Sequence, residues 1–426
     1  MTNTNSTCRL GFFPTAKDIM YYKFSCCSRI KLHKMLLITL SIFVIPILTF
    51  GYLKYYQSRK KLLITNGHQA QLILKSSAYS RCKPNRWLVD TLSIVNPFTI
   101  DSETLLKGFK AEVKDNLAHW CGNEQIYHEL VLTIRNRIAY RLSVLMSSNS
   151  TICLFQLVKQ ATLDAFLTGI LHVHANEDLL TELPQLIIHL WANRDDQNAR
   201  NRVRELIAAN RHAFGQSVFW QHIEQVLSNH SNIISQIATN DFDEKIANPL
   251  NIIVPGWETM WRVVFYSLLE LLRRRELLQE LRVQLNQCEQ QSYRKCLLLQ
   301  WILKEILRLY PPTKNIYRSD RTTGQDVQIS VKQIHYDKNV WGSDARSFRP
   351  NRFKDKLTDE QNHSYLPFSI SCPARHGFAY AFAGAIVAEI LQHCPTFSLA
   401  DQSNSLQTDQ LLDMARDSYK DLLIHV

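Results

Sequence analysis

The sequence predicts a mainly α-helical fold with a minor β component. Its 426 residues include only 12 Gly and 13 Pro, and 46% are hydrophobic, which is enough for a sizeable core. Between about 100 and 240, apolar residues recur at steps of three and four, the spacing of amphipathic helices. The same spacing continues through 250–291 and 294–310, and short strand-like pieces follow up to about 370.

The charge distribution and the cysteine spacing limit which classes of partner and which compartment are expected. The formal net charge is +11, but Lys and Arg are scattered and aromatic residues do not interleave with a basic stripe. This pattern disfavours nucleic-acid binding and suits a basic face for an acidic protein or an anionic membrane. The ten cysteines contain one tight pair, Cys26–Cys27, and no C-x-x-C, so a reducing compartment is the simpler inference.

The N-terminal region predicts a membrane anchor. Residues 35–53 carry no charge, which is long enough for a single spanning helix, with Pro46 as a tolerated kink. A buried core helix is the alternative. We expect 1–34 to be a poorly ordered leader and 54–426 to form the catalytic domain, beginning with a basic lead-in. Basic residues flank the span on both sides, so charge alone leaves its orientation open.

Six helices are expected in the region before residue 240. They cover Glu103–Ala118, Gln125–Met146, Leu154–Leu171, Leu183–Asn193, Asn201–Ala208 and Gln216–Leu227. The pair His172 and His174 does not lie on one helical face and has no acidic or Cys partner at ligand spacing. We interpret the pair as structural, because a zinc site needs three or four clustered ligands.

The run 250–291 opens at a Pro/Asn turn and carries an unusual segment, G-W-E-T, at 256–259. Pro255 and Gly256 loosen the helix, and Glu258 and Thr259 then present an acid beside an alcohol. Such a pair can relay protons from solvent to a bound oxygen species. The alternative is an ordinary kinked core helix with a surface glutamate.

The run 294–310 places Glu305 and Arg308 one helical turn apart, where opposite charges can pair. Most E-x-x-R pairs are exposed, but apolar residues surround this one, so we expect it to be buried and further hydrogen-bonded. The helix ends at Pro311–Pro312. Downstream, Arg352 lies near two apolar anchors and is a candidate third member that docks on Glu305.

Cys372 stands in a short loop before an Ala-rich helical run at 378–391. A helix N-terminus favours negative charge, so we expect the thiol to deprotonate more easily. One thiolate cannot build a zinc or iron–sulfur site, but it can be the axial ligand of haem iron. The alternative is an inert, partly buried free cysteine.

Taken in order, these motifs resemble the cytochrome P450 family of haem-thiolate mono-oxygenases, most closely its membrane-bound fungal members. The resemblance rests on G-W-E-T, K-E-I-L-R-L-Y-P-P, W-G-S-D-A-R-S-F-R-P-N-R-F and the C-terminal cysteine, and covers about 245–395. It implies that Cys372 is the haem iron ligand and that Glu305, Arg308 and Arg352 form a buried triad. It further implies that Glu258 and Thr259 form the catalytic acid–alcohol pair, with Gly256 making room for dioxygen.

The haem loop departs from the family pattern F-x-x-G-x-R-x-C-x-G. Phe368 lies four residues before Cys372, where seven are expected, and the loop lacks the glycine and the basic residue that would hold a haem propionate. Ala374 replaces the following glycine, and Arg375 is a candidate substitute for the missing base. The segment between Pro312 and His335 is also shortened.

The resemblance implies a function: insertion of one oxygen atom from dioxygen into an apolar small molecule, in fungal terpenoid or polyketide biosynthesis. The cofactor would be haem, and electrons would come from NADPH through a flavoprotein reductase. The protein would be anchored in the endoplasmic reticulum with its catalytic domain in the cytosol. The alternative is a catalytically inactive, membrane-anchored remnant of the same fold.

Overall fold

The computed structural model describes residues 61–146, 151–237, 242–288, 292–375, 377–400, 406 and 410–426. The leader and the anchor predicted at 1–53 lie outside these residues. Within the described part of the chain, no helix combines the length and the apolar character needed to cross a bilayer.

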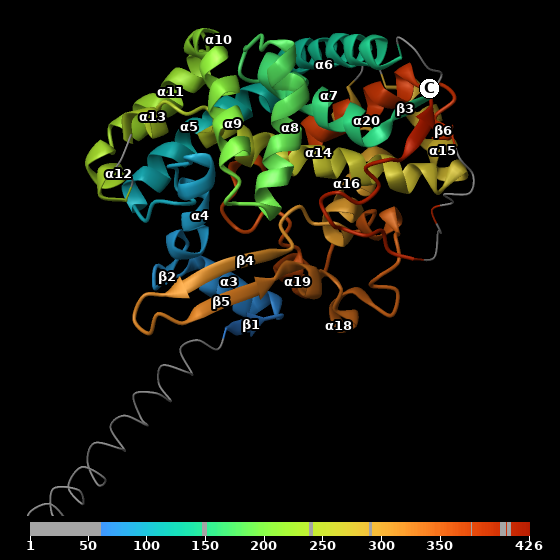
Figure 1. Ribbon diagram of the computed structural model, residues 1–426. Helices are drawn as coiled ribbons and strands as arrows, with labels where there is room; N and C mark the ends of the chain where they lie inside the picture. The colour runs from blue at the N-terminus through green and yellow to red at the C-terminus, as the bar shows by residue number, and fades with distance from the viewer. Residues whose placement is uncertain are drawn as a thin grey trace, which may run out of the picture. The chain divides into compact units, whose positions relative to one another are not determined.

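Long helices form the core (Figure 1). At its centre lies α14 (Leu250–Leu272), which contacts α7 (Leu154–Gly169), α16 (Leu297–Leu309) and α20 (Phe378–His393). On the far side of α7 and α20, both helices pack against α6 (Glu124–Leu145). Nearly every residue of α14 and α20 is buried, so apolar side chains on all faces stabilise this layer.

The remaining helices surround this core. They are α3 (Gly67–Lys75), α4 (Cys82–Leu92), α5 (Glu103–Gly122), α8 (Glu177–Ala192), α9 (Gln197–Ala209), α10 (Arg211–Gly215), α11 (Val218–Ser228), α12 (Ser231–Ile237), α13 (Phe242–Ile246), α15 (Arg275–Asn286), α17 (Val331–His335), α18 (Lys338–Trp341) and α19 (Asp359–Ser364). Several begin at side-chain caps: Ser102 accepts from the Leu105 N–H, and Asn176 accepts from the Leu179 N–H.

Two small sheets supply the minor β component of the described residues. The first has the order β1-β5-β4-β2, from β1 (Leu62–Ile64), β5 (Asp326–Ser330), β4 (Asn315–Asp320) and β2 (Tyr79–Ser80). Only its β1–β5 pair is parallel, with Leu63 opposite Gln328. The second sheet has the order β3-β7-β6, from β3 (Thr151–Cys153), β7 (Leu423–His425) and β6 (Ser398–Leu399), so it ties the C-terminal end to the start of α7.

The predicted class, mainly α-helical with a minor β component, is confirmed for the described residues. Several predicted helices have different bounds: α8 begins at Glu177 and not at Leu183, and α9 begins at Gln197 and not at Asn201. Two longer runs differ as well. The run predicted at 250–291 divides into α14 and α15, with Arg274 in a non-helical conformation between them. No Gly or Pro marks this break in the sequence, so apolar periodicity alone does not reveal it. The run predicted at 294–310 begins with a 3₁₀ turn at Tyr293–Lys295, and α16 starts only at Leu297.

The loosening expected at Pro255 does not end the helix, because α14 continues through it. A proline lacks the N–H that would bind the carbonyl four residues earlier, here that of Asn251. Instead, the side-chain amide of Asn96 donates to the Asn251 carbonyl at 2.9 Å. The Asn251 side chain in turn accepts from the Val95 N–H at 2.7 Å. A loop from the N-terminal half therefore satisfies the backbone group that the proline frees.

Candidate functional site

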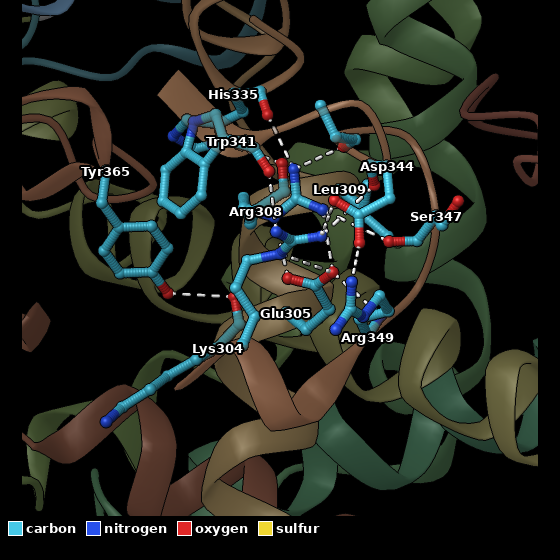
Figure 2. A network of polar contacts seen from close by, with 12 residues as sticks. Lys304, Glu305, Arg308, Leu309, His335, Trp341, Asp344, Ser347, Arg349 and Tyr365 are labelled. Atoms are coloured by element: carbon cyan, nitrogen blue, oxygen red, sulfur yellow. Dashed lines mark hydrogen bonds and ion pairs between the residues drawn. The ribbon is translucent and has the colours of Figure 1, made fainter. Parts of the chain in front are cut away.

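The predicted pair Glu305 and Arg308 is fully buried on α16 (Figure 2). Two parallel hydrogen bonds of 2.8 Å join the guanidinium to the carboxylate. Arg308 also donates to the carbonyls of His335 and Ala345, at 2.7 and 2.6 Å, and lies over the Trp341 ring. A buried ion pair is tolerated when such bonds satisfy its remaining polar atoms, so this network ties α16 to the loops that follow α17 and α18.

Arg352 lies beside the pair and forms an ion pair with Glu305. Its Nε is 3.7 Å from Glu305 Oε1, an ion-pair distance without a hydrogen bond. The guanidinium instead donates to the carbonyls of Trp341 and Asp344, at 2.8 and 3.2 Å. A third hydrogen bond to the Glu305 carboxylate comes from the backbone N–H of Arg349, at 3.0 Å from Oε1.

His335 connects this network to the cysteine loop, a role that the sequence analysis missed. Its Nδ1 donates to the Arg308 carbonyl at 2.8 Å, and its Nε2 accepts from the Leu366 N–H at 2.9 Å. These two bonds require the neutral ring, and burial lowers the pKa of His335 to about 3. The sequence shows that His335 follows the helix of Glu305 and Arg308, but it does not predict the contact with Leu366, which depends on the tertiary fold.

The loop that carries Cys372 follows directly. Ser369 adopts a positive φ of 55°, and its N–H donates to the Leu366 carbonyl at 3.1 Å, which closes a tight turn. Phe368 packs edge-on against Tyr380 of α20. Cys372 is partly buried and precedes a 3₁₀ turn at Pro373–Arg375. The short loop is thus fixed at both ends.

The expected lowering of the Cys372 pKa is wrong for this structure. Burial raises the pKa of the thiol, and the N–H groups of Ala374 and Arg375, with the charges of Arg375 and Lys110, oppose this effect only in part. The physical reason is position: α20 begins at Phe378, so Cys372 lies ahead of its first turn, where the helix dipole acts weakly.

Cys372 lines a cavity of about 260 Å³ between its loop and α5. The other lining residues are Lys110, Ala111, Lys114, Ile370, Ser371, Pro373 and Arg375. These residues fit haem chemically. The thiol of Cys372 is available for the iron, and the cations of Lys110, Lys114 and Arg375 are available for the two propionate carboxylates of haem. The volume lies below the ~300–1,000 Å³ of pockets that enclose a cofactor-sized molecule.

The predicted acid–alcohol pair is not joined in this structure. Pro255, Gly256 and Thr259 form a partly exposed stripe on α14, whereas Glu258 is buried on another face. The Thr259 hydroxyl donates to the carbonyls of Pro255 and Gly256 in its own helix. Glu258 accepts from Trp261 Nε1 at 2.8 Å and pairs with Arg416 from the C-terminal segment. Arg416 carried no signal in the sequence.

Gly256 does not face open space in the direction of an added side chain. A Cβ there would lie 2.4 Å from Cζ of Phe166, whose ring comes from α7. The Phe166 ring also meets Phe382 of α20 edge-on, at 6.3 Å between centroids. The glycine is therefore explained by the close approach of an aromatic ring. Its expected role of making room for dioxygen stays a prediction.

A larger cavity of about 950 Å³ lies away from all the predicted site residues. It is bounded by α4, α9, α10, α11, α13 and the start of α14, and its lining mixes apolar side chains with charges of both signs. His172 and His174 line neither cavity, and the described residues contain no group of three or more His, Cys, Asp and Glu that could hold a metal.

The sequence of this chain is similar to those of known proteins. Residues 173–415, more than half of the chain, match the sequence profile of the family described as Cytochrome P450. A bifunctional cytochrome P450/NADPH–P450 reductase of Bacillus subtilis is 31% identical over 136 residues, which cover 29% of this chain and 12% of that protein.

Two plant proteins are similar over other lengths. Cytochrome P450 84A4 of Arabidopsis thaliana is 30% identical over 184 residues, 38% of this chain and 35% of that protein. Secologanin synthase 1 of Catharanthus roseus is 38% identical over 80 residues, 16% of this chain and 15% of that protein. The matched regions thus span about a third or less of these relatives. With its buried Glu–Arg helix and its cysteine ahead of a buried helix, this chain belongs to the cytochrome P450 family.

Proposed function

We propose that this protein binds haem through Cys372 and is a mono-oxygenase that acts on an apolar small molecule. The observation that carries the proposal is the composition of the cavity at Cys372, where a single thiol lies among Lys110, Lys114 and Arg375. A haem bound there would activate dioxygen, with the axial thiolate favouring O–O cleavage. The overall reaction is R–H + O₂ + NADPH + H⁺ → R–OH + H₂O + NADP⁺.

The chain's own residues would have three tasks. Cys372 would hold the iron, and the three cations would neutralise the carboxylates of the porphyrin, with Arg375 in the place of the missing loop arginine. Thr259, on the partly exposed stripe of α14, would orient a proton toward the bound oxygen, and Glu258 would supply it. The network of Glu305, Arg308 and Arg352 would hold the cysteine loop in place through His335.

The proposed electron donor is an NADPH-dependent flavoprotein reductase that docks on the basic face near Cys372. Lys110 and Lys114 of α5 contribute to this face. Relatives that carry a cytochrome P450 and a reductase in one chain support a partner of this kind. The proposed location is the endoplasmic reticulum, where the span expected at 35–53 would anchor a cytosolic catalytic domain.

The proposed substrate is a terpenoid or polyketide intermediate of fungal secondary metabolism. This part of the proposal rests on the likeness of the C-terminal motifs to fungal, membrane-bound members of the family, and a shared fold supports many substrates. Substrate-dependent shifts of the haem absorption across a panel of such compounds would test it. Binding of polar compounds in preference to apolar ones would contradict it.

A second candidate is a catalytically inactive, membrane-anchored remnant of the fold. The shortened loop before Cys372 and the volume of about 260 Å³ favour it, because a whole porphyrin needs more room than this cavity encloses. The two candidates differ in one measurable quantity, the amount of haem that the folded protein retains.

The test uses the full-length chain, expressed with its N-terminal region and purified in detergent. We expect one haem per chain, and incorporation of one ¹⁸O atom from ¹⁸O₂ into the product when a reductase and NADPH are present. Folded protein that takes up no haem on reconstitution would overturn the mono-oxygenase and leave the remnant. Retained haem without ¹⁸O incorporation, for every apolar compound tried, would reject the activity but keep the haem site.

A further inference from the structure

Two cysteine thiols lie against the same glutamine at the junction of α15 and α16. Cys288 follows the C-cap of α15, and Cys296 directly precedes the first residue of α16. The Cys288 thiol donates to the backbone carbonyl of Gln284 at 3.3 Å, and Sγ of Cys296 lies 3.8 Å from Oε1 of the same glutamine. The two thiols are also hydrogen-bonded to each other. They are therefore in contact although they stand eight positions apart in the sequence.

The two thiols differ in exposure. Both are free, but Cys288 is half-buried, whereas Cys296 is 5% exposed. An oxidant from the solvent therefore reaches Cys288 first, and Cys296 lies behind it as the second thiol of a disulfide. Because the two sulfur atoms are already in contact, a small movement of the side chains brings them to bonding distance.

The connector between the two cysteines binds two helices of the core. Tyr293 of its 3₁₀ turn donates to the buried Glu389 of α20 at 2.9 Å. Lys295, at the end of the same turn, pairs with Glu124 of α6 at 2.8 Å. A covalent bond between the cysteines would join the two ends of this connector. It would therefore fix the end of α15 to the start of α16, the helix of the buried Glu–Arg pair.

Burial keeps the pair reduced under ordinary conditions. It raises the pKa of Cys296 to about 11, and it raises the pKa of Cys288, which the hydrogen bond from the Cys296 thiol opposes in part. Because the thiolate is the reactive form, both thiols react slowly at neutral pH. Such a pair suits a reducing compartment, where disulfides form only transiently when an oxidant accumulates.

We propose that Cys288 and Cys296 form a reversible disulfide that fastens α15 to α16 when the protein meets a peroxide. The sulfur of Cys288 attacks one oxygen of hydrogen peroxide and the O–O bond breaks. The leaving hydroxide takes up the thiol proton, so the products are a sulfenic acid and water. The Cys296 thiol then displaces the hydroxyl group of the sulfenic acid, which forms the S–S bond and releases a second water. The sum is 2 R–SH + H₂O₂ → R–S–S–R + 2 H₂O, and a dithiol reverses it by exchange.

Peptide mapping of the full-length chain tests the bond directly, because trypsin cleaves between the two cysteines. Its cleavage sites place Cys288 in the peptide 283–294 and Cys296 in the peptide 296–304. Folded protein is treated with excess hydrogen peroxide, alkylated and digested without reductant. The two peptides should then appear joined, at the sum of their masses less two hydrogen atoms, and dithiothreitol should separate them.

Variants show whether the joined peptides come from this pair. Cys288→Ala and Cys296→Ala should each abolish them. The matched control is Cys153→Ala, because Cys153 is also half-buried and its thiol donates to the backbone carbonyl of Lys420. This variant should keep the joined peptides. Circular dichroism of each variant confirms that the helices are retained.

Thermal unfolding tests whether the bond fits the folded protein. The oxidised original protein should unfold about 2–4 °C above the reduced protein, because a disulfide restricts the unfolded chain. The difference should be absent from Cys288→Ala. A lower midpoint in the oxidised protein would show that the bond distorts the fold and would overturn its fastening role.

Three mapping results would overturn the disulfide itself. The first is oxidation of Cys288 to a sulfinic acid with peptide 296–304 left unjoined. The second is a bond from Cys288 to a different cysteine. The third is formation of the joined peptides only in urea-unfolded protein. These measurements need no haem and no turnover, so the outcome does not depend on the proposed mono-oxygenase function.

Discussion

The backbone N–H of Arg349 donates a 3.0 Å hydrogen bond to Glu305 Oε1, the carboxylate that also holds Arg308. Main chain from the loop after α18 thereby completes a buried ion pair on α16, and the Arg352 side chain supports that loop from the other side. The fold fixes the position of a backbone donor. The hydrogen bonding of the Glu305 carboxylate therefore depends on correct packing of the loop after α18.

Removal of one charge of this pair should destabilise the protein strongly. Glu305→Gln leaves the fully buried Arg308 without its counter-ion, and we expect a loss of about 3–5 kcal/mol in the free energy of unfolding. Urea unfolding of the full chain measures this. The control is Glu360→Gln, which breaks the exposed pair with His68 and should cost less than about 1 kcal/mol. Equal losses in the two variants would contradict the buried network.

His335 should make the protein sensitive to acid. Its pKa is lowered to about 3 in the folded state, against an ordinary value of 6.5, so the unfolded chain binds the proton more readily. Stability should therefore be fully present above about pH 6.5 and be lost progressively as the pH falls toward 3, at about 1.4 kcal/mol per unit of pKa difference.

The variant His335→Gln should remove this part of the pH dependence, at the cost of lower stability at pH 7. Unfolding free energies measured from pH 7 to pH 4 would show a flatter profile for the variant. His222→Gln serves as the control, since the His222 ring is 55% exposed. If the unfolding free energy of His335→Gln falls with pH as steeply as that of the original protein, His335 is not the source of the acid sensitivity.

Gly256→Ala should destabilise the core by about 1–3 kcal/mol, because the new methyl group would overlap the Phe166 ring. Thermal unfolding measures the loss, and a smaller side chain in Phe166→Leu should recover part of it. The control is Gly215→Ala on α10, where an added Cβ meets nothing within 4 Å. A neutral Gly256→Ala would show that the ring does not press on this glycine.

The basic residues beside Cys372 should govern reductase binding. In protein that still holds one haem per chain, Lys110→Glu with Lys114→Glu should raise the KM for the reductase about tenfold or more and flatten the dependence of its association rate on salt. Lys107→Glu, an exposed residue of the same helix that does not line the cavity, is the matched control. An effect of Lys107→Glu half as large as that of the double variant would point to net charge in place of a defined docking face.

Local patterns accounted for most of what the sequence predicted correctly. Glu305 and Arg308 lie one turn apart on a helix wrapped in apolar residues, so their pairing and burial follow from spacing alone. The helices around them follow from apolar periodicity in the same way. The division of 250–291 into two helices was missed, because the break carries neither glycine nor proline.

The contacts that the sequence missed join residues far apart in the chain. His335 binds Leu366 across 31 residues, and Asn96 binds the carbonyl of Asn251 across 155. Arg416 reaches Glu258 from the other end of the domain. Such pairs depend on how helices and loops pack, and no periodicity or local motif records them. The sequence therefore carries no sign that Glu258 is hydrogen-bonded to Trp261 and ion-paired with Arg416.

Whether the Cys372 thiolate holds haem iron is decided by the carbon monoxide difference spectrum of the reduced, full-length protein. We expect the shifted Soret band of a thiolate–haem–carbonyl complex, and its loss in Cys372→Ala while the helical circular dichroism stays unchanged. The same shifted band in Cys372→Ala, or its absence from folded, haem-reconstituted protein, would rule out Cys372 as the haem iron ligand.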